Sequence, residues 1–255
     1  RRLSLAGREI VLVGTAHVSK ESVDEVGSII TSENPDMVCV EIDQGRYNAM
    51  QEENSWAKLD IRKVLKEGRG FLLLANLVLS SYQKRLGAGI GVKPGDEMRQ
   101  AINVAADLGI PTSLCDREIS LTLKRAWSRC GLWSKAKLMT ALISSALTTE
   151  KMDEKQIESL KNKNELDGMM AELADYLPTV KEVLIDERDR YLASKIWDSA
   201  GIKLVAVVGA GHMNGIVSWL ERLALGEVNS NVDDIEILPK PSFLSKAAGW
   251  IIPVL

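Results

Sequence analysis

The fold of this chain is decided by a stretch near its start, Glu9 to Ile42, which reads EIVLVGTAHVSKESVDEVGSIITSENPDMVCVEI. Two β-branched runs within it, Glu9 to Thr15 and Met37 to Ile42, are typical of buried strands. Between them, Ser19 to Thr31 predicts a helix, because Ser19 suits an N-cap and Val23, Val26, Ile29 and Ile30 share one face. A strand, a helix and a strand in such close succession predict a βαβ unit and hence a parallel sheet.

The rest of the chain extends this pattern. We expect a helix opening at Pro94-Gly95, a short strand at Thr112 to Cys115, a helix from Pro178 to Ser199 and a strand from Ile202 to Val208. Gly70 to Tyr82 is apolar but shorter than the roughly 20 residues of a membrane span, which favours a core helix. The predicted fold is α/β, with a mainly parallel central sheet in two related halves. Each half carries a GxxH motif, Gly14 to His17 and Gly209 to His212.

Domain boundaries follow from these elements. We expect one α/β catalytic domain over residues 1–240, with a helical insertion at about 119–177 where strand signals are missing. The alternative, that this segment is a helical layer on the sheet, stays open. Residues 241–255 form an apolar tail. Because the chain begins Arg1-Arg2-Leu3, we expect it to be a fragment.

Composition excludes several classes of protein. The chain has 255 residues, of which 45% are hydrophobic and 26% charged, as in ordinary soluble globular proteins. A net charge of -3 gives no basic footprint for a nucleic-acid binder. The three cysteines form no CxxC pair, which indicates reduced thiols facing the cytosol and no thiolate zinc site.

Titratable residues stand where the predicted strands end. They are His17, Glu41, the Asp116-Arg117 pair and His212, and the two histidines are the only ones in the chain. Carboxyl ends of parallel strands converge on one rim of the sheet, where ligands usually bind. The sequence therefore predicts a polar site built around His17 and His212.

Each candidate also has a structural interpretation. Glu41 could form an ion pair with Arg46 or Arg117, and Asp116 could cap a helix. Glu97 could merely favour the first turn of a helix. The charged run Asp186 to Arg190 is interpreted as a solvated helix face.

Six ordered segments carry a resemblance to a known family. They are GTAHVS (Gly14 to Ser19), VEIDQGRY (Val40 to Tyr47), KPGDEM (Lys93 to Met98), CDR (Cys115 to Arg117), ERDRYLA (Glu187 to Ala193) and VVGAGHMNGI (Val207 to Ile216). Together they resemble the TraB family of pheromone-shutdown proteins, which is similar in turn to the TIKI metalloproteases. That resemblance implies two GxxH histidines and a glutamate that support metal-dependent peptide cleavage, typically with manganese or cobalt. These carry over onto His17, His212 and Glu41.

The expected function is therefore metal-dependent hydrolysis, most simply of a peptide. His17, His212 and Glu41 would hold one divalent ion, either by themselves or jointly with a carboxylate such as Glu97 or Asp116. Manganese or cobalt is favoured, and zinc would also suit such ligands. A bound ion lowers the pKa of its water, a remaining carboxylate serves as general base, and Arg46 or Arg117 stabilises the oxyanion.

Two other functions stay open. One is a non-catalytic, membrane-tethered domain that binds a peptide signal. The other is a metal-free esterase with His17 as base, which a wider resemblance to the erythromycin esterase group implies. The expected partner is a peptide substrate or signal, with no nucleic acid, and a homo-oligomer is compatible with the sequence. The family resemblance also implies a membrane-associated protein with a cytoplasmic catalytic domain, whose chain continues past Leu255 into membrane helices.

Overall fold

The computed structural model describes residues 1–15, 20–51, 95–147, 175 and 177–239. His17, the helix expected at Gly70 to Tyr82 and the tail 241–255 lie outside these residues. Within them the chain forms a five-stranded sheet of order β1-β2-β5-β3-β4. The strands are β1 (Arg2–Leu5), β2 (Arg8–Thr15), β3 (Met37–Val40), β4 (Thr112–Leu114) and β5 (Lys203–Gly209).

The sheet is mainly parallel, as the sequence predicted. β2 pairs with β5, β5 with β3, and β3 with β4, all in parallel, whereas β1 pairs antiparallel with β2. The sequence analysis missed β1, an edge strand. It joins β2 through a two-residue turn, Ala6-Gly7, in which both residues have positive φ, the geometry of a tight hairpin.

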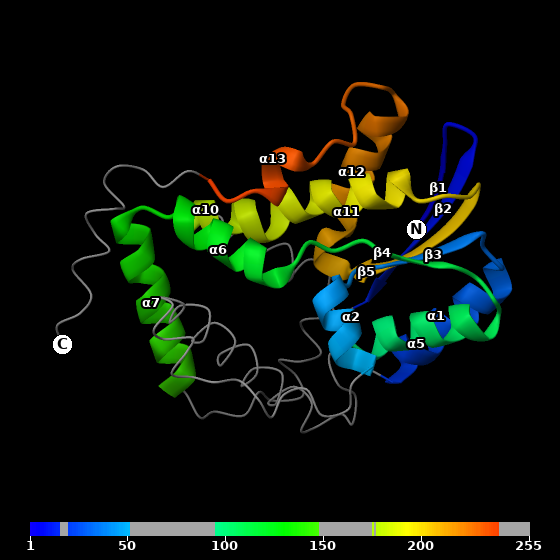
Figure 1. Ribbon diagram of the computed structural model, residues 1–255, viewed down its shortest axis with the longest axis horizontal. Helices are drawn as coiled ribbons and strands as arrows, with labels where there is room; N and C mark the ends of the chain where they lie inside the picture. Colours follow the sequence, from blue (N-terminus) through cyan, green and yellow to red (C-terminus); the bar gives the residue numbers. More distant parts are fainter. Residues whose placement is uncertain (16–19, 52–94, 148–174, 176, 240–255) are drawn as a thin grey trace.

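Helices cover both faces of the sheet (Figure 1). On one face lie α1 (Lys20–Glu33) and α5 (Asp96–Asp107), and on the other α11 (Glu187–Asp198) and α12 (Met213–Ala224). Alternate residues of β5 enter the two cores: Leu204, Ala206 and Val208 pack with α11 and α12, while Val205 and Val207 pack with α1 and α5. Side chains of a strand point alternately to opposite faces, so a strand covered on both faces is apolar throughout, which explains the β-branched runs.

The helix predicted from Pro178 to Ser199 is interrupted by a π-helix. The chain passes from α10 (Pro178–Lys181) through the π-helix η2 (Glu182–Asp186) into α11. Pro178 opens the first turn, where its missing N–H costs nothing. A π-turn inserts one extra residue, so it changes the direction in which all later side chains point.

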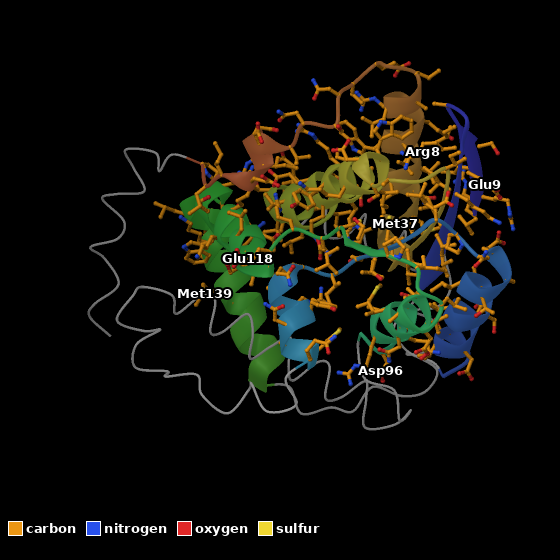
Figure 2. All side chains as sticks on the ribbon, turned by 45° about the vertical axis from the view of Figure 1, so that its right-hand side comes forward. Arg8, Glu9, Met37, Asp96, Glu118 and Met139 are labelled. Atoms are coloured by element: carbon orange, nitrogen blue, oxygen red, sulfur yellow. The ribbon has the colours of Figure 1, made fainter. Side chains whose placement is uncertain are left out.

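The carboxyl ends of the strands face a helical segment. It comprises α6 (Ile119–Arg129), α7 (Leu132–Leu147) and the short α13 (Asp233–Glu236). Figure 2 shows Arg8 and Glu9, at the start of β2, on the opposite side of the molecule from Glu118 and Met139 of this segment. Short elements complete the fold: α2 (Gln44–Gln51) after β3, and the 3-10 turn η3 (Ala210–His212) after β5. Among the described helices, none combines the length and apolar character that crossing a membrane requires.

Candidate functional site

The predicted rim site forms where β5, β3 and β4 end side by side. Glu41 follows β3, Asp116 lies two residues past β4, and His212 ends η3 just after β5. All three side chains are buried. The Nε2 atom of His212 lies 3.7 Å from Oε1 of Glu41, so the strand ends do bring these two predicted residues together.

The centre of this cluster is Arg188, which the sequence analysis did not single out. Its Nη2 donates to Oε1 of Glu41 at 2.6 Å and to Oδ2 of Asp116 at 2.7 Å. Its Nε donates to Oδ1 of Asp116 at 3.0 Å. The resulting fork across the Asp116 carboxylate is the strongest geometry that an arginine can adopt.

The same guanidinium fixes the protonation of His212. Nη1 of Arg188 lies 3.0 Å from Nε2 of His212. An arginine can only donate, so Nε2 must accept, and the imidazole is neutral with its proton on Nδ1. Nδ1 lies 2.6 Å from Oδ1 of Asp189, which accepts that proton. Arg188 and Asp189, neighbours in the first turn of α11, thus hold both nitrogens of one ring.

Backbone N–H groups hold two further carboxylate oxygens near the cluster. Oε2 of Glu41 accepts the backbone N–H of Gly209 at 2.6 Å, which ties the end of β3 to the end of β5. Asp43, two residues further on, accepts the N–H of Arg46 through Oδ1 at 3.0 Å and so caps the start of α2. The carboxylates of Glu41, Asp43 and Asp116 are therefore each held beyond a strand end by a backbone N–H or by Arg188.

Charge within the cluster is compensated by Arg188. Burial disfavours its positive charge, but the carboxylates of Asp116 and Glu41 outweigh burial and raise the pKa of the guanidinium above its ordinary value. Asp189 is different: burial raises the pKa of its carboxyl, and the hydrogen bond from His212 opposes that rise only in part.

The other predicted site residues lie at different places. Arg46 reaches the solvent edge of the cluster, with Nη1 3.7 Å from Oδ2 of Asp116 and a half-exposed side chain. Glu97 is fully buried in the first turn of α5 and is not among the described contacts of Arg188. Arg117 lies outside the cluster, because its guanidinium is directed to Glu187, Thr122 and backbone carbonyls.

The interpretation of Asp186 to Arg190 as a solvated helix face is wrong for the two residues that flank Arg188. Glu187 is 8% exposed and Asp189 is 6% exposed, and both take part in buried ion pairs. One signal could have pointed to Arg188: the segment ERDRYLA was among those that carried the family resemblance.

Comparison with known proteins decides the family. The sequence model of the TraB/PrgY/gumN family matches residues 1–226. The chain belongs to the TraB/PrgY/gumN family. It is 39% identical to an uncharacterised protein of Methanocaldococcus jannaschii over 90% of this chain and 57% of that protein. It is 28% identical to the TraB domain-containing proteins of Bos taurus and Homo sapiens, in each case over 92% of this chain and 67% of the relative. The TraB chain described here therefore spans little more than half of its archaeal relative.

The described ligand candidates of this TraB chain do not fit a divalent ion. Glu41, Asp116 and Nε2 of His212 all face the one guanidinium of Arg188, whose N–H groups are donated to one oxygen of Glu41, to both oxygens of Asp116 and to Nε2 of His212. Across the described residues, no three histidine, cysteine or acidic side chains are grouped to hold a metal ion. A dication in this position would meet a fixed positive charge a few ångströms away, so Arg188 would first have to leave.

Proposed function

We propose that this chain is a hydrolase of acyl compounds, with peptides as the favoured substrates, and that Arg188 supplies the positive charge of its site. The observation that carries the proposal is the position of the Arg188 guanidinium, which joins Glu41, Asp116 and His212 at the carboxyl ends of three neighbouring strands. Buried charged groups are costly unless they are paired, and clusters of them that converge from separate elements are typical of catalytic sites.

Arg188 is suited to stabilise an oxyanion. A guanidinium has five N–H donors, and four of them are used by Glu41, Asp116 and His212. Among the described residues, the remaining N–H on Nη1 has no acceptor. A fixed donor in a buried, low-dielectric site is the arrangement that stabilises a developing negative charge at a carbonyl oxygen.

His212 is suited to orient Arg188 and not to take up a proton. Its Nε2 lone pair already accepts from Nη1, and its Nδ1 proton is donated to Asp189. We therefore assign the general base to His17, as the metal-free hypothesis does. Water would add its oxygen to the acyl carbon, His17 would take the released proton, and that proton would pass to the leaving amine as the carbon–nitrogen bond breaks.

A peptide-library cleavage assay with and without chelator tests this proposal. We expect cleavage that persists in chelator and falls by at least about 100-fold in Arg188→Lys and in His17→Ala. Lysine keeps the charge but cannot bridge three acceptors in one plane. Arg190→Lys is the matched control, because Arg190 lies on the same helix and forms a two-pronged ion pair with Asp234 away from the site.

Two results would overturn the proposal in different directions. Cleavage that requires manganese or cobalt and disappears in chelator would establish the metal-dependent peptidase instead. Saturable peptide binding without turnover under any metal would establish the non-catalytic binder.

A further inference from the structure

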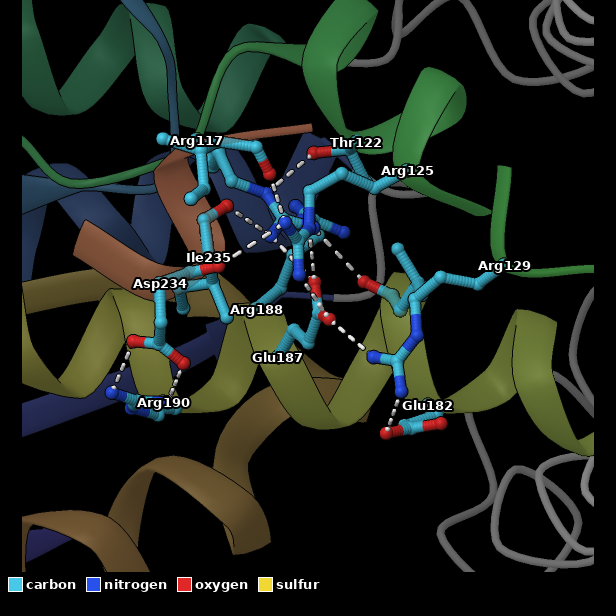
Figure 3. Close-up of polar contacts among 12 residues, drawn as sticks. Arg117, Thr122, Arg125, Arg129, Glu182, Glu187, Arg188, Arg190, Asp234 and Ile235 are labelled. Atoms are coloured by element: carbon cyan, nitrogen blue, oxygen red, sulfur yellow. Dashed lines mark hydrogen bonds and ion pairs between the residues drawn. The ribbon is translucent and has the colours of Figure 1, made fainter. Parts of the chain in front are cut away.

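A second buried charge cluster lies directly beside the site, on the other side of α11. Its centre is Glu187, the residue before Arg188 (Figure 3). Oε2 of Glu187 accepts from Nη1 of Arg117 at 2.7 Å and from Nε of Arg125 at 2.9 Å. Oε1 accepts from Nη2 of Arg125 and from Nη1 of Arg129, both at 2.8 Å. Four charge-assisted hydrogen bonds use the full acceptor capacity of one carboxylate.

The arginines of this cluster are themselves fixed to the backbone. Arg117 donates to the carbonyl oxygens of Val183 and Ile235 at 3.1 and 3.0 Å. Arg125 donates to the carbonyls of Asp234 and Ile237. The cluster therefore ties Glu187 to the π-helix η2, to α6 and to the segment around α13. Burial disfavours the charge on the Glu187 carboxyl, but the hydrogen bonds from Arg125 and Arg117 outweigh it and lower its pKa.

Three consecutive residues of α11 contact two neighbouring clusters. Glu187 contacts the arginines, Arg188 contacts Glu41, Asp116 and His212, and Asp189 contacts His212. Successive side chains of an α-helix are about 100° apart around its axis. The rotation of α11 about its axis therefore decides whether Arg188 meets its three acceptors. The π-turn immediately before Glu187 sets that rotation, and π-turns recur at functional sites.

We infer that Glu187, held by Arg117, Arg125 and Arg129, is a positioning residue that fixes the rotation of α11 and thereby places the guanidinium of Arg188. The inference rests on the proposed function only in taking Arg188 as the group that acts. Buried ion pairs contribute little net stability on average, whereas they do hold groups in one geometry. Three arginines around one carboxylate also exceed what neutralising its charge requires.

Nitrogen-15 NMR of the imidazoles tests this placement without any substrate. The chain has two histidines, so His17→Gln leaves the ring of His212 as the single imidazole signal. In that background, Arg188→Lys gives the Nε2 resonance of a ring that has lost its Nη1 donor. We expect Glu187→Gln to move the Nε2 resonance at least halfway to that reference. Arg190→Gln, which alters an ion pair on the same helix, should leave it in place.

Arg129→Gln provides a milder variant should Glu187→Gln not fold. The Arg129 side chain is 33% exposed and makes one of the four bonds to Glu187. We expect a smaller Nε2 shift in the same direction, with Arg129→Lys restoring part of the original position. Where activity is measurable, the kcat of Glu187→Gln should fall about 10-fold or more with KM unchanged, since small displacements of a reacting group are costly.

A folded Glu187→Gln, or Arg129→Gln in its place, with an unshifted Nε2 resonance would overturn the inference. That result would show that the arginine cluster stabilises the fold without placing Arg188. Because the NMR measurement needs no turnover, it gives its answer even if the chain proves not to be a hydrolase.

Discussion

Asp189 occupies the space where Gly215 lacks a side chain. A β-carbon built on Gly215 would lie 1.9 Å from Oδ2 of Asp189 and 2.3 Å from its Cγ. Gly215 is in the first turn of α12, and Asp189 is in the first turn of α11. The two helices therefore approach closely at the point where Asp189 accepts the Nδ1 proton of His212. Glycine at position 215 makes this hydrogen bond sterically accessible.

Gly215→Ala should displace Asp189 and so free the ring of His212. We expect a loss of about 1–3 kcal/mol in the free energy of unfolding, as is usual for overpacking, and a larger loss of hydrolysis than the stability change explains. Denaturant unfolding and peptide cleavage measure the two effects. Gly131→Ala is the control, because a β-carbon there would meet nothing within 4 Å. Unchanged activity in a destabilised Gly215→Ala would show that hydrolysis does not depend on the position of Asp189.

Removal of Arg188 should destabilise the fold as well as the site. Arg188→Ala leaves Glu41 and Asp116 buried without their shared cation, a change that costs about 3–5 kcal/mol when a buried pair loses one partner. Arg190→Ala removes an ion pair that includes the mainly exposed Asp234 and should cost about 1 kcal/mol or less. Thermal and denaturant unfolding of both variants make the comparison, and equal losses would contradict the central role of Arg188.

The central strands β2, β3 and β5 could be predicted because each is covered on both faces. Ile10 to Val13 and Leu204 to Val208 are apolar at every position, the pattern typical of parallel strands buried on both faces. The carboxyl ends of these strands then predicted Glu41, Asp116 and His212 as neighbours. β1 was missed because a four-residue edge strand with alternating burial carries little signal.

Arg188 could not be predicted from local pattern. A run of charged residues in a helix is ordinarily solvated, and whether it is buried depends on partners far away in the chain. Those partners, Asp116 and Glu41, are 72 and 147 residues distant in sequence. The rotation that presents Arg188 to them depends on a π-turn, for which the sequence EVLID gives no recognisable signal.

The stability of the protein should depend on pH through Asp189. Burial raises the pKa of its carboxyl above 3.8, so the folded state binds this proton more tightly than the unfolded state does. The stability from Asp189 is then fully present below pH 3.8 and is lost as the pH rises through the folded pKa. Asp189→Asn should lack this decline.

Denaturant unfolding of wild type and Asp189→Asn across this pH range gives the difference directly. Contributions from other carboxylates, including Glu187 with its lowered pKa, occur in both proteins and cancel. Asp198→Asn serves as the control, since Asp198 is an exposed residue at the other end of the same helix. A wild-type advantage that grows with rising pH would have the wrong sign for a buried Asp189 and would refute this prediction.

Metal binding should be gained, not lost, when Arg188 is removed. In the wild type the guanidinium donates to Glu41, to Asp116 and to Nε2 of His212, so manganese or cobalt would compete with a fixed cation. Arg188→Ala leaves two carboxylates and one neutral imidazole facing the same volume, a ligand set that suits these ions. Isothermal titration with manganese should therefore show binding to Arg188→Ala at concentrations where the wild type binds little. Arg188→Ala/Glu41→Gln should lose that binding, because one of the two anionic ligands is gone. Tight manganese binding by the wild type that Arg188→Ala does not strengthen would place the ion elsewhere, and His17 and Glu97 would then be the residues to substitute next.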